Sequence, residues 1–418
     1  MRIAIVGAGI SGLACAHLLH RDHEIVVFEA ADRPGGHANT VHVETDSGAY
    51  DVDTGFIVFN DRNYPNFERI LGELAVPTQP SRMSFGVSDG AGFEYNGASL
   101  NGLFASRRHI VSRSFYGMVA ELIRFNRDAR ELLHSGENVS LRDWLARLRY
   151  SPAFIDRLIV PQASAVWSAD PAQMWSFPAR FMVEFFANHG MLGFRGRPRW
   201  RTVTGGSRSY VEALTAPFSE RIRLGAAVTG IDRDDDGVGV SARGGETERF
   251  DAVVLATHSD QALAVLSDPS DRERDLLGAI PYQPNEAVLH TDRSLLPRRR
   301  RAWASWNYHL EAEPRGCSTV TYHMNSLQSL RADREFCVTL NRTDAIDPDQ
   351  IIARFQYSHP VYTPEGVAAQ ARHEEISGRN RTHYCGAYWG WGFHEDGVRS
   401  ALRVVSELGA RRVDAVRV

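Results

Sequence analysis

The chain opens with two short apolar runs separated by a glycine-rich turn, an arrangement that few folds accommodate. Arg2–Val6 leads into Gly7-Ala-Gly9-Ile-Ser-Gly12, then a helix-like stretch and a second apolar run that ends at Glu29. In such a unit the first glycine permits a tight turn, the second lets backbone approach a pyrophosphate, and the third lets the helix pack closely on the strand. The N–H groups and positive dipole at the helix start favour phosphate. The pattern therefore predicts an α/β unit that binds a dinucleotide.

An acidic residue follows this turn at an informative separation. Glu29 lies 20 residues after Gly9, where a carboxylate can bind the hydroxyls of a ribose. Its negative charge would repel a 2′-phosphate, so NADP is the least expected occupant. Gly35 and Gly36 stand just past the acid, where a plain dehydrogenase would begin a second crossover helix. Paired glycines indicate that the backbone approaches the ligand a second time.

Length and composition narrow the class of protein. At 418 residues the chain is too long for one ordinary domain and fits two interleaved ones. A hydrophobic share of 43% and a charged share of 23% exclude a largely disordered protein. The formal net charge of -4 argues against a nucleic-acid partner.

Cysteine spacing and the start of the chain bear on its location. The four cysteines, Cys15, Cys317, Cys337 and Cys385, lack the paired spacing of metal ligands, so we expect reduced thiols and no metal site. The first strand begins at Arg2, which leaves no room for a secretory signal. No run of about 18 apolar residues is long enough to span a membrane. We therefore expect a cytoplasmic protein.

Lysine is absent from the chain, and all 47 basic residues are arginine. The simplest explanation is the base composition of the source genome. Whatever its origin, the absence excludes any mechanism that requires a lysine base or a lysine Schiff base.

The segment after Glu29 points to flavin rather than nicotinamide. Arg33-Pro-Gly35-Gly36-His37-Ala-Asn-Thr40 resembles the second flavin motif of the family that holds amine oxidases, protoporphyrinogen oxidases and carotenoid desaturases. That family typically has arginine where this chain has His37. The departure affects one expected phosphate contact, for which a histidine could still donate a hydrogen bond.

Further segments resemble the same family. Asp53-Thr-Gly55-Phe56 is similar to the turn beside the flavin ring, and the main chain around Val228 is similar to the adenine contact. Cys385–Gly397, which precedes a helix-like run from Val398 to Leu408, resembles the last flavin motif, in which a helix start points at the pyrimidine edge of the ring. No Cys or His can be placed beside the methyl edge, so the resemblance implies noncovalent FAD. The residues expected to bind it are Gly7, Ala8, Gly9, Ile10, Ser11, Gly12, Glu29, Ala30, Arg33, Gly35, Gly36, His37, Ala38, Asn39, Gly55, Phe56, Val228, Trp391, Gly392, Phe393, His394, Glu395, Asp396 and Val398.

The resemblance covers three separated pieces of the chain most strongly. It implies an α/β fold with a discontinuous Rossmann-type FAD-binding domain and an α+β substrate domain built from helices and an antiparallel sheet. The FAD-binding domain is expected over 1–80, 200–275 and 375–418, and the substrate domain over 81–199 and 276–374. Within the second piece of the substrate domain, the apolar runs 287–290, 319–323 and 336–340 are expected to form an antiparallel sheet.

An apolar stripe in the substrate half has two interpretations. It comprises Phe181, Met182, Phe185, Phe186, Met191, Leu192 and Phe194. Such a stripe is usually core. The alternative is the wall of a tunnel for a long apolar substrate, where Met and Phe adapt to the ligand.

The resemblance narrows to a bacterial subfamily. The stretches beginning at Trp303, Thr321 and Gly392 resemble amine-oxidase-like flavoproteins that are commonly encoded beside cyclopropane-fatty-acyl-phospholipid synthases. Some relatives desaturate methylated membrane acyl chains. The resemblance implies an FAD-dependent oxidoreductase that dehydrogenates a lipid acyl chain by hydride transfer to flavin N5, with oxygen or a quinone as final acceptor.

Five polar side chains are the candidates for catalysis. His394 or Glu395 is the expected base, and Tyr308 and Tyr322 are expected to orient the substrate. His323 is a further candidate near the ring. Only the geometry of the folded chain decides among them.

Three other functions stay open. A flavin amine oxidase would lack the lysine that such enzymes generally hold near the ring, although Tyr388 and Trp389 could imitate an aromatic amine cage. A carotenoid-type desaturase or isomerase is a second alternative. A flavin-binding partner protein without turnover is a third.

One basic run suggests a membrane surface. Arg298–Arg301 lies beside Trp303 and Trp306, and such a combination suits anionic head groups and the interfacial layer. A solvated arginine loop is the alternative. We expect a cytoplasmic protein with peripheral docking on the inner membrane face as an option, and the oligomeric state is left open.

Overall fold

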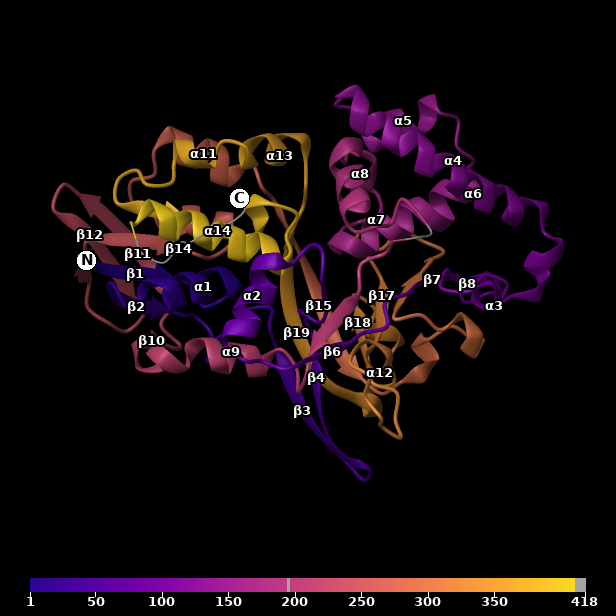
Figure 1. Cartoon of the computed structure of the whole chain (residues 1–418), viewed down its shortest axis with the longest axis horizontal. Helices are drawn as coiled ribbons and strands as arrows, with labels where there is room; N and C mark the ends of the chain where they lie inside the picture. The colour runs from indigo at the N-terminus through magenta and orange to yellow at the C-terminus, as the bar shows by residue number, and fades with distance from the viewer. Residues whose placement is uncertain (194–195, 410–418) are drawn as a thin grey trace.

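The computed structural model describes residues 1–193 and 196–409, so Phe194 of the apolar stripe and residues 410–418 of the expected FAD-binding domain lie outside it. A parallel five-stranded sheet, in the order β10-β2-β1-β14-β20, forms one half of the molecule (Figure 1). Three separated parts of the chain supply its strands: β1 (Arg2–Val6) and β2 (Glu24–Phe28), β10 (Ile222–Arg223) and β14 (Ala252–Leu255), and β20 (Thr382–Tyr384).

Both faces of this sheet are covered. Ile3 and Ile5 point toward one apolar cluster, which includes residues of α1 (Ile10–Leu19) and α14 (His394–Glu407). Ala4 and Val6 point toward the other, beneath the antiparallel sheet β11-β12-β13. Because successive side chains of a strand face opposite sides, a continuous apolar run is needed at this central position.

The second half is built on a seven-stranded sheet in the order β19-β15-β18-β17-β16-β7-β8. Neighbouring strands are antiparallel except for β16 and β7, which run parallel. The three strands expected from sequence at 287–290, 319–323 and 336–340 are β15, β17 and β18, and β18 pairs with both of the others. Helices α4 to α8 pack beyond this sheet (Figure 1).

The predicted fold class, a Rossmann-type α/β unit joined to an α+β unit, is confirmed. The remaining strands are β3 (Thr40–Thr45), β4 (Gly48–Asp53), β5 (Phe59–Asn60), β6 (Thr78–Pro80), β7 (Phe85–Ser88), β8 (Glu94–Asn96), β9 (Trp200–Val203), β11 (Val228–Asp234), β12 (Gly237–Ala242), β13 (Glu248–Phe250), β15 (Tyr282–His290), β16 (Trp306–His309), β17 (Val320–His323), β18 (Cys337–Leu340) and β19 (Ile351–Pro360). The remaining α-helices are α2 (Pro65–Glu73), α3 (Leu100–Leu103), α4 (Arg113–Ser135), α5 (Leu141–Arg147), α6 (Pro152–Phe154), α7 (Val160–Trp167), α8 (Ala179–Asn188), α9 (Arg208–Thr215), α10 (Ser259–Val265), α11 (Asp271–Gly278), α12 (Met324–Leu327) and α13 (Pro364–Gln370).

The last helix starts earlier than its sequence suggests. We expected a helical run from Val398, whereas α14 begins at His394. Asp396 stabilises this start, because its side chain accepts a hydrogen bond from the N–H of Phe393 at 3.1 Å.

Among the described residues, no helix is both long enough and apolar enough to cross a bilayer.

Candidate flavin and substrate site

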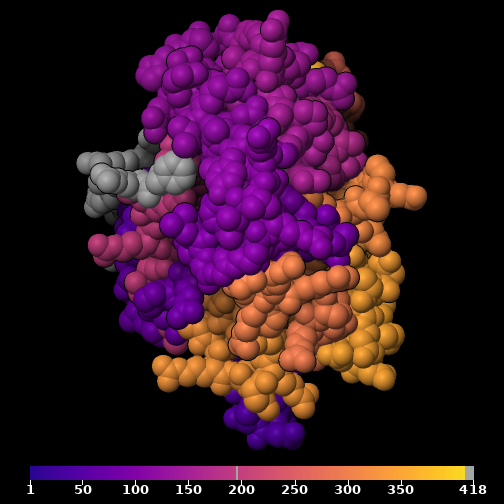
Figure 2. Space-filling view, turned by 90° about the vertical axis from the view of Figure 1, so that its right-hand side faces the viewer, coloured from indigo at the N-terminus to yellow at the C-terminus, as the bar shows by residue number. Residues whose placement is uncertain are grey.

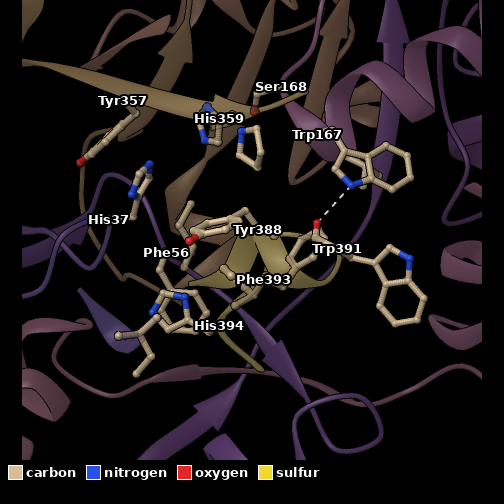
Figure 3. A pocket seen from close by; sticks show the side chains of 18 of the residues that line it. His37, Phe56, Trp167, Ser168, Tyr357, His359, Tyr388, Trp391, Phe393 and His394 are labelled. Carbon is tan, nitrogen blue, oxygen red and sulfur yellow. Dashed lines mark hydrogen bonds between the residues drawn. The ribbon is translucent and has the colours of Figure 1, made fainter. Parts of the chain in front are cut away.

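A cavity of about 1320 Å³ joins the two halves. At one end it is lined by the carboxyl ends of β1 and β2, where a doubly wound sheet places its ligand. At the other end it is lined by Leu103 of α3 and by Met118 and Leu122 of α4. Figure 3 shows the middle, with His37 and Tyr357 across the pocket from Trp167 and Trp391.

The sheet end of the cavity is built for a phosphate and a ribose. Gly9 caps α1 without any side-chain hydrogen bond, and no protein atom lies within 4 Å of where its Cβ would be. Glu29 directly follows β2 and accepts hydrogen bonds from the backbone N–H groups of Ala8 at 2.7 Å and Ala31 at 2.9 Å. An open glycine, an unpaired helix start and a fixed carboxylate fit a dinucleotide.

A buried carboxylate holds the turn that lies deeper in the cavity. Asp53 accepts hydrogen bonds from Thr40, Ser207 and Gln328, at 2.6 to 3.0 Å. Burial raises the pKa of Asp53 to about 6 despite these donors. The bonds tie together segments that are distant in sequence, and they fix the turn Gly55–Phe56 against the cavity.

Three histidines gather where the family has one arginine. His37 stacks on Tyr357 at 4.8 Å between ring centroids, and the rings of His359 and His258 lie 5.4 and 6.1 Å from it. All three line the cavity, and His37 Nε2 is buried without a hydrogen-bond partner. Burial, then the neighbouring imidazoles, lowers the pKa of His37 well below its usual range. A neutral ring still offers an N–H to a ligand oxygen.

Most of the residues expected to bind FAD lie along this cavity. Those that line it are Gly7, Gly9, Ile10, Ser11, Glu29, Ala30, Arg33, Gly35, Gly36, His37, Gly55, Phe56, Val228, Trp391, Gly392, Phe393 and His394. Those that do not line it are Ala8, Gly12, Ala38, Asn39, Glu395, Asp396 and Val398.

The side chains outside the lining have other partners in the structure. Asn39 donates to the hydroxyls of Thr54 and Tyr357 at 2.9 and 3.2 Å. Asp396 holds the start of α14, and Val398 is fully buried in the core between α14 and the parallel sheet. Each supports a neighbour that does line the cavity.

Of the two candidate bases, only His394 lines the cavity. His394 lines the cavity, stacks on Phe56 at 3.4 Å and places its Nε2 2.9 Å from the hydroxyl of Tyr210. Burial lowers its pKa to about 3, so the ring is neutral and a weak proton acceptor. Glu395 faces away from the cavity and accepts three N–H bonds, at 2.7 to 3.3 Å, from the first turn of α2. It caps a helix, and we withdraw it as a base.

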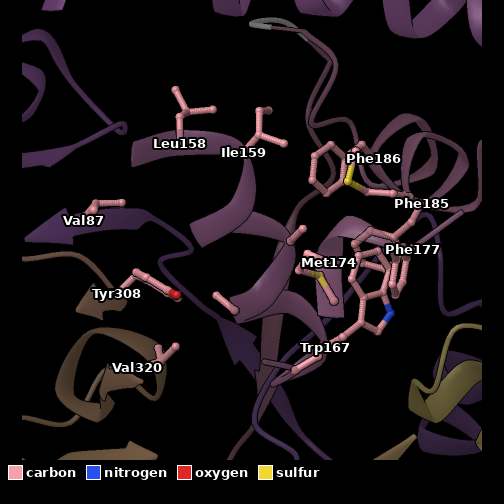
Figure 4. Packing of buried hydrophobic residues seen from close by; sticks show 14 of the residues in the cluster. Val87, Leu158, Ile159, Trp167, Met174, Phe177, Phe185, Phe186, Tyr308 and Val320 are labelled. Carbon is pink, nitrogen blue, oxygen red and sulfur yellow. The ribbon is translucent and has the colours of Figure 1, made fainter. Parts of the chain in front are cut away.

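Of the other three candidates, which lie on strands beside the cavity, only Tyr322 lines it. Tyr322 of β17 lines the cavity and meets Trp306 edge-to-face at 5.1 Å. His323, the next residue, lies on the opposite face and bonds Ser326 and Glu335, each at 2.8 Å. Tyr308 lies in the apolar core, outside the cavity lining (Figure 4). Tyr308 and His323 therefore lie outside the cavity lining, and the roles expected for them stay predictions.

Several lining residues carried no sequence signal that we used. They are Trp167, His258, Tyr357 and His359. His258 follows the carboxyl end of a parallel strand closely, a position typical of ligand contacts, so it was open to prediction. Trp167 ends α7, while Tyr357 and His359 lie on β19, and no local pattern marks them. Trp306, noted beside the arginine run, and Tyr388, noted as part of a possible amine cage, line the cavity too.

Comparison with known proteins identifies the family. The sequence profile described as flavin containing amine oxidoreductase matches residues 10–328. The chain belongs to this family. It is a flavin-containing oxidoreductase whose cofactor is FAD. A Mycobacterium tuberculosis protein assigned as a flavin-containing monoamine oxidase, AofH, is 30% identical over 281 residues, which cover 64% of this chain and 59% of that relative.

Solved structures of other proteins share the fold at low identity. Cyclohexylamine oxidase from Brevibacterium oxydans superposes with a TM-score of 0.69 at 17% identity, covering 97% of this chain and 99% of that one. A conjugated-linoleic-acid-producing fatty acid isomerase from P. acnes gives a TM-score of 0.68 at 15% identity, covering 98% of each chain. The fold thus serves both amine and fatty-acid chemistry.

We expect Glu29→Ala to lower FAD affinity by about 1.5–3 kcal/mol, which is roughly 10- to 150-fold, because a charged hydrogen-bond acceptor is lost. Flavin titration by fluorescence measures the change. Glu24→Ala is the matched control, since Glu24 lies on the same strand with its side chain 67% exposed. Normal FAD binding by Glu29→Ala would show that this carboxylate does not contact the ribose.

We expect the flavin to be noncovalent. None of the cavity-lining residues in the described part of the chain is a cysteine. Acid or heat denaturation should release the flavin into the supernatant. Colour that stays with the precipitated protein would contradict this expectation and direct attention to the histidines of the lining.

Proposed function

We propose that this protein dehydrogenates a lipid acyl chain, most simply a methylated membrane fatty acid. The substrate loses two hydrogens as a hydride and a proton, and a carbon–carbon double bond forms. Bound FAD supplies the hydride acceptor. Oxygen or a quinone would then take the electrons from the flavin.

The observation that carries this proposal is the chemistry of the cavity beyond the sheet. Met83, Phe85, Leu103, Met118 and Leu122 line that end. Glu29, at the sheet end, is the one carboxylate among the described lining residues. A long hydrocarbon is favourably buried in such a space, whereas a cationic group would lose its hydration without gaining a counter-charge.

Three side chains of the middle section have proposed roles. Tyr322 and Trp306 form one wall, where they would restrict how the chain lies. The Nε1 of Trp306 is buried without a partner and can donate to a polar group of the substrate. His394 is proposed as a positioning residue, because its neutral ring packs flat on Phe56 and bonds Tyr210.

The comparisons support two substrate classes. The fatty acid isomerase among the structural neighbours favours an acyl chain, and it does so by fold alone. The monoamine oxidase assignment of AofH favours an amine. Amine oxidation is our second candidate, since aromatic side chains including Trp167, Tyr322 and Trp391 line the cavity and could surround an uncharged amine.

Anaerobic reduction of the bound flavin tests both candidates. Detergent-dispersed phospholipids with methylated acyl chains, free fatty acids and a set of amines including cyclohexylamine would be mixed with the yellow protein. The proposal predicts loss of visible flavin absorbance with the acyl substrates, and a product two hydrogens lighter by mass spectrometry. Bleaching by amines alone would replace it with amine oxidation.

We expect Leu122→Trp to slow flavin reduction by long acyl chains at least tenfold while leaving FAD content unchanged. Leu122 lines the end of the cavity away from the parallel sheet, and the added ring fills the space that the distal chain would occupy. Ile123→Trp is the control, because the neighbouring side chain is 60% exposed. Equal slowing of short and long substrates would mean that the chain does not extend into this end.

A further inference from the structure

We infer that the surface formed by α3, the 3-10 turn Arg107–Val111, the first half of α4 (residues 113–123) and the loop 293–303 docks on an anionic lipid bilayer. We call it the docking face. The inference rests on the proposed function, since it supplies the route by which an esterified acyl chain would reach the cavity.

Exposed apolar side chains concentrate on this face. Of the eight large hydrophobic residues exposed among those the structure describes, five lie between residues 100 and 123. They include Leu100 at 77%, Val111 at 85% and Ile123 at 60% exposure. Isolated exposed hydrophobics are ordinary, but a cluster within one short segment marks a binding surface.

The charge of the face is mainly positive. Residues 97–123 hold three arginines and one acidic residue, Glu121, and residues 293–310 hold five arginines and no Asp or Glu. The segments touch, because Arg301 donates to the carbonyl of Ala105 at 2.8 Å and Asn96 donates to the carbonyl of Trp303 at 2.6 Å. Figure 2 shows the purple surface of the first segment directly above the orange surface of the second.

The arginine run predicted from sequence contributes only in part. Arg299 pairs at 2.6 Å with Glu94, which is buried, so its charge is neutralised within the protein. Arg298 and Arg300 are exposed, and the ion pair of Arg300 with Glu335 is long, at 3.6 Å. Arg107, Arg108 and Arg113 are exposed on the neighbouring segment. The basic surface is therefore shared between two segments.

The face also covers the apolar end of the cavity. Leu103, Met118, Val119 and Leu122 come from the same helices as the exposed residues and line the interior. α4 thus presents apolar side chains to both sides, with arginines at its start. A bilayer fits this combination, because it receives apolar side chains at its interface and attracts arginines to its anionic head groups.

Vesicle sedimentation tests the inference. The FAD-loaded protein would be spun with vesicles of phosphatidylcholine alone, or of phosphatidylcholine with phosphatidylglycerol. Two variants remove the features separately: Leu100→Ser/Ile110→Ser/Val111→Ser, and Arg107→Gln/Arg108→Gln/Arg298→Gln/Arg300→Gln. Two double variants are the controls, Leu224→Ser/Ile352→Ser and Arg21→Gln/Arg243→Gln, which change exposed residues of the same kinds elsewhere.

We expect wild type and both controls to bind the anionic vesicles. Each arginine contributes roughly fivefold to partitioning, so the four-arginine variant should bind on the order of 600-fold less. The apolar variant should bind at least tenfold less. Salt at 1 M should weaken wild-type binding, because the Debye length shortens to about 3 Å. Wild-type FAD content confirms that each variant is folded.

Three results would overturn the inference: equal binding to neutral and anionic vesicles, full binding by both variants, or a lipid-free dimer that the apolar variant dissociates. The last would make the face an interface between copies of this chain. Reduction of the flavin by detergent-dispersed lipid should survive in both variants. Failure of the proposed function would instead appear as no reduction by any acyl lipid, with vesicle binding intact.

Discussion

Gly12→Ala is expected to prevent accumulation of folded protein, whereas Gly9→Ala in the same motif is expected to fold and lose FAD. A Cβ on Gly12 would lie 1.9 Å from the backbone oxygen of Gly7. Neither backbone segment can move without separating α1 from the parallel sheet. We therefore expect a cost on the order of 3 kcal/mol or more.

Gly9 has the opposite surroundings. A Cβ there meets no protein atom within 4 Å and points into the cavity. Its added methyl group therefore obstructs only the ligand, and overpacking of about 1–3 kcal/mol corresponds to roughly 5- to 150-fold weaker FAD binding.

Thermal unfolding of the apoprotein and flavin titration separate the two effects. Gly72→Ala serves as the control, because Gly72 lies in α2 with no atom within 4 Å of a Cβ. The Gly72→Ala substitution should raise the free energy of unfolding by about 0.5–1 kcal/mol. A stable, flavin-free Gly12→Ala protein would show that both glycines act at the ligand.

Arg233→Ala should destabilise the FAD-binding half by about 3–5 kcal/mol, because it leaves a buried carboxylate without its cation. Arg233 of β11 contacts Glu273 of α11 at 2.6 and 3.1 Å, and their side chains are 2% and 1% exposed. Arg249→Ala is the control. Its ion pair with Asp234 is as short, at 2.6 Å, but the two side chains are half exposed, so we expect a loss below about 1 kcal/mol.

The ion pair of Arg233 and Glu273 also makes the stability of the protein depend on pH. Burial opposes ionisation of Glu273, but hydrogen bonds from Arg233, Tyr384 and Ser270 lower its pKa to about 2. The folded pKa lies below the unfolded one, so the stabilisation is full above about pH 4.5 and is lost as the pH falls toward 2. Urea unfolding at several pH values should show this loss in wild type. An equal dependence in Arg233→Ala would place its source elsewhere.

The dinucleotide unit was predictable because its chemistry is contiguous. Strand, turn, helix and acid follow one another from Arg2 to Glu29, and each part is specified by neighbours along the chain. In the structure Gly7, Gly9 and Glu29 all line one cavity. The antiparallel strands of the second half could likewise be predicted from short apolar runs.

For the substrate domain, the sequence predicted an apolar composition but not which residues line the cavity. The apolar stripe of 178–194 divides between two roles, since Phe185 and Met191 line the cavity while Met182 and Phe186 do not. Periodicity shows that a helix has an apolar face, but it does not show which members of that face meet empty space and which meet another helix.

The polar site residues depended on contacts between distant segments. Glu395 looked like a base beside His394, yet its carboxylate reaches the start of α2 and caps it. His37, His258 and His359 meet although more than 300 residues separate the first from the last. Local sequence specifies backbone conformation and residue chemistry, which act over a few residues. Burial, hydrogen-bond partners and pKa values arise from long-range packing, and only the folded chain sets them.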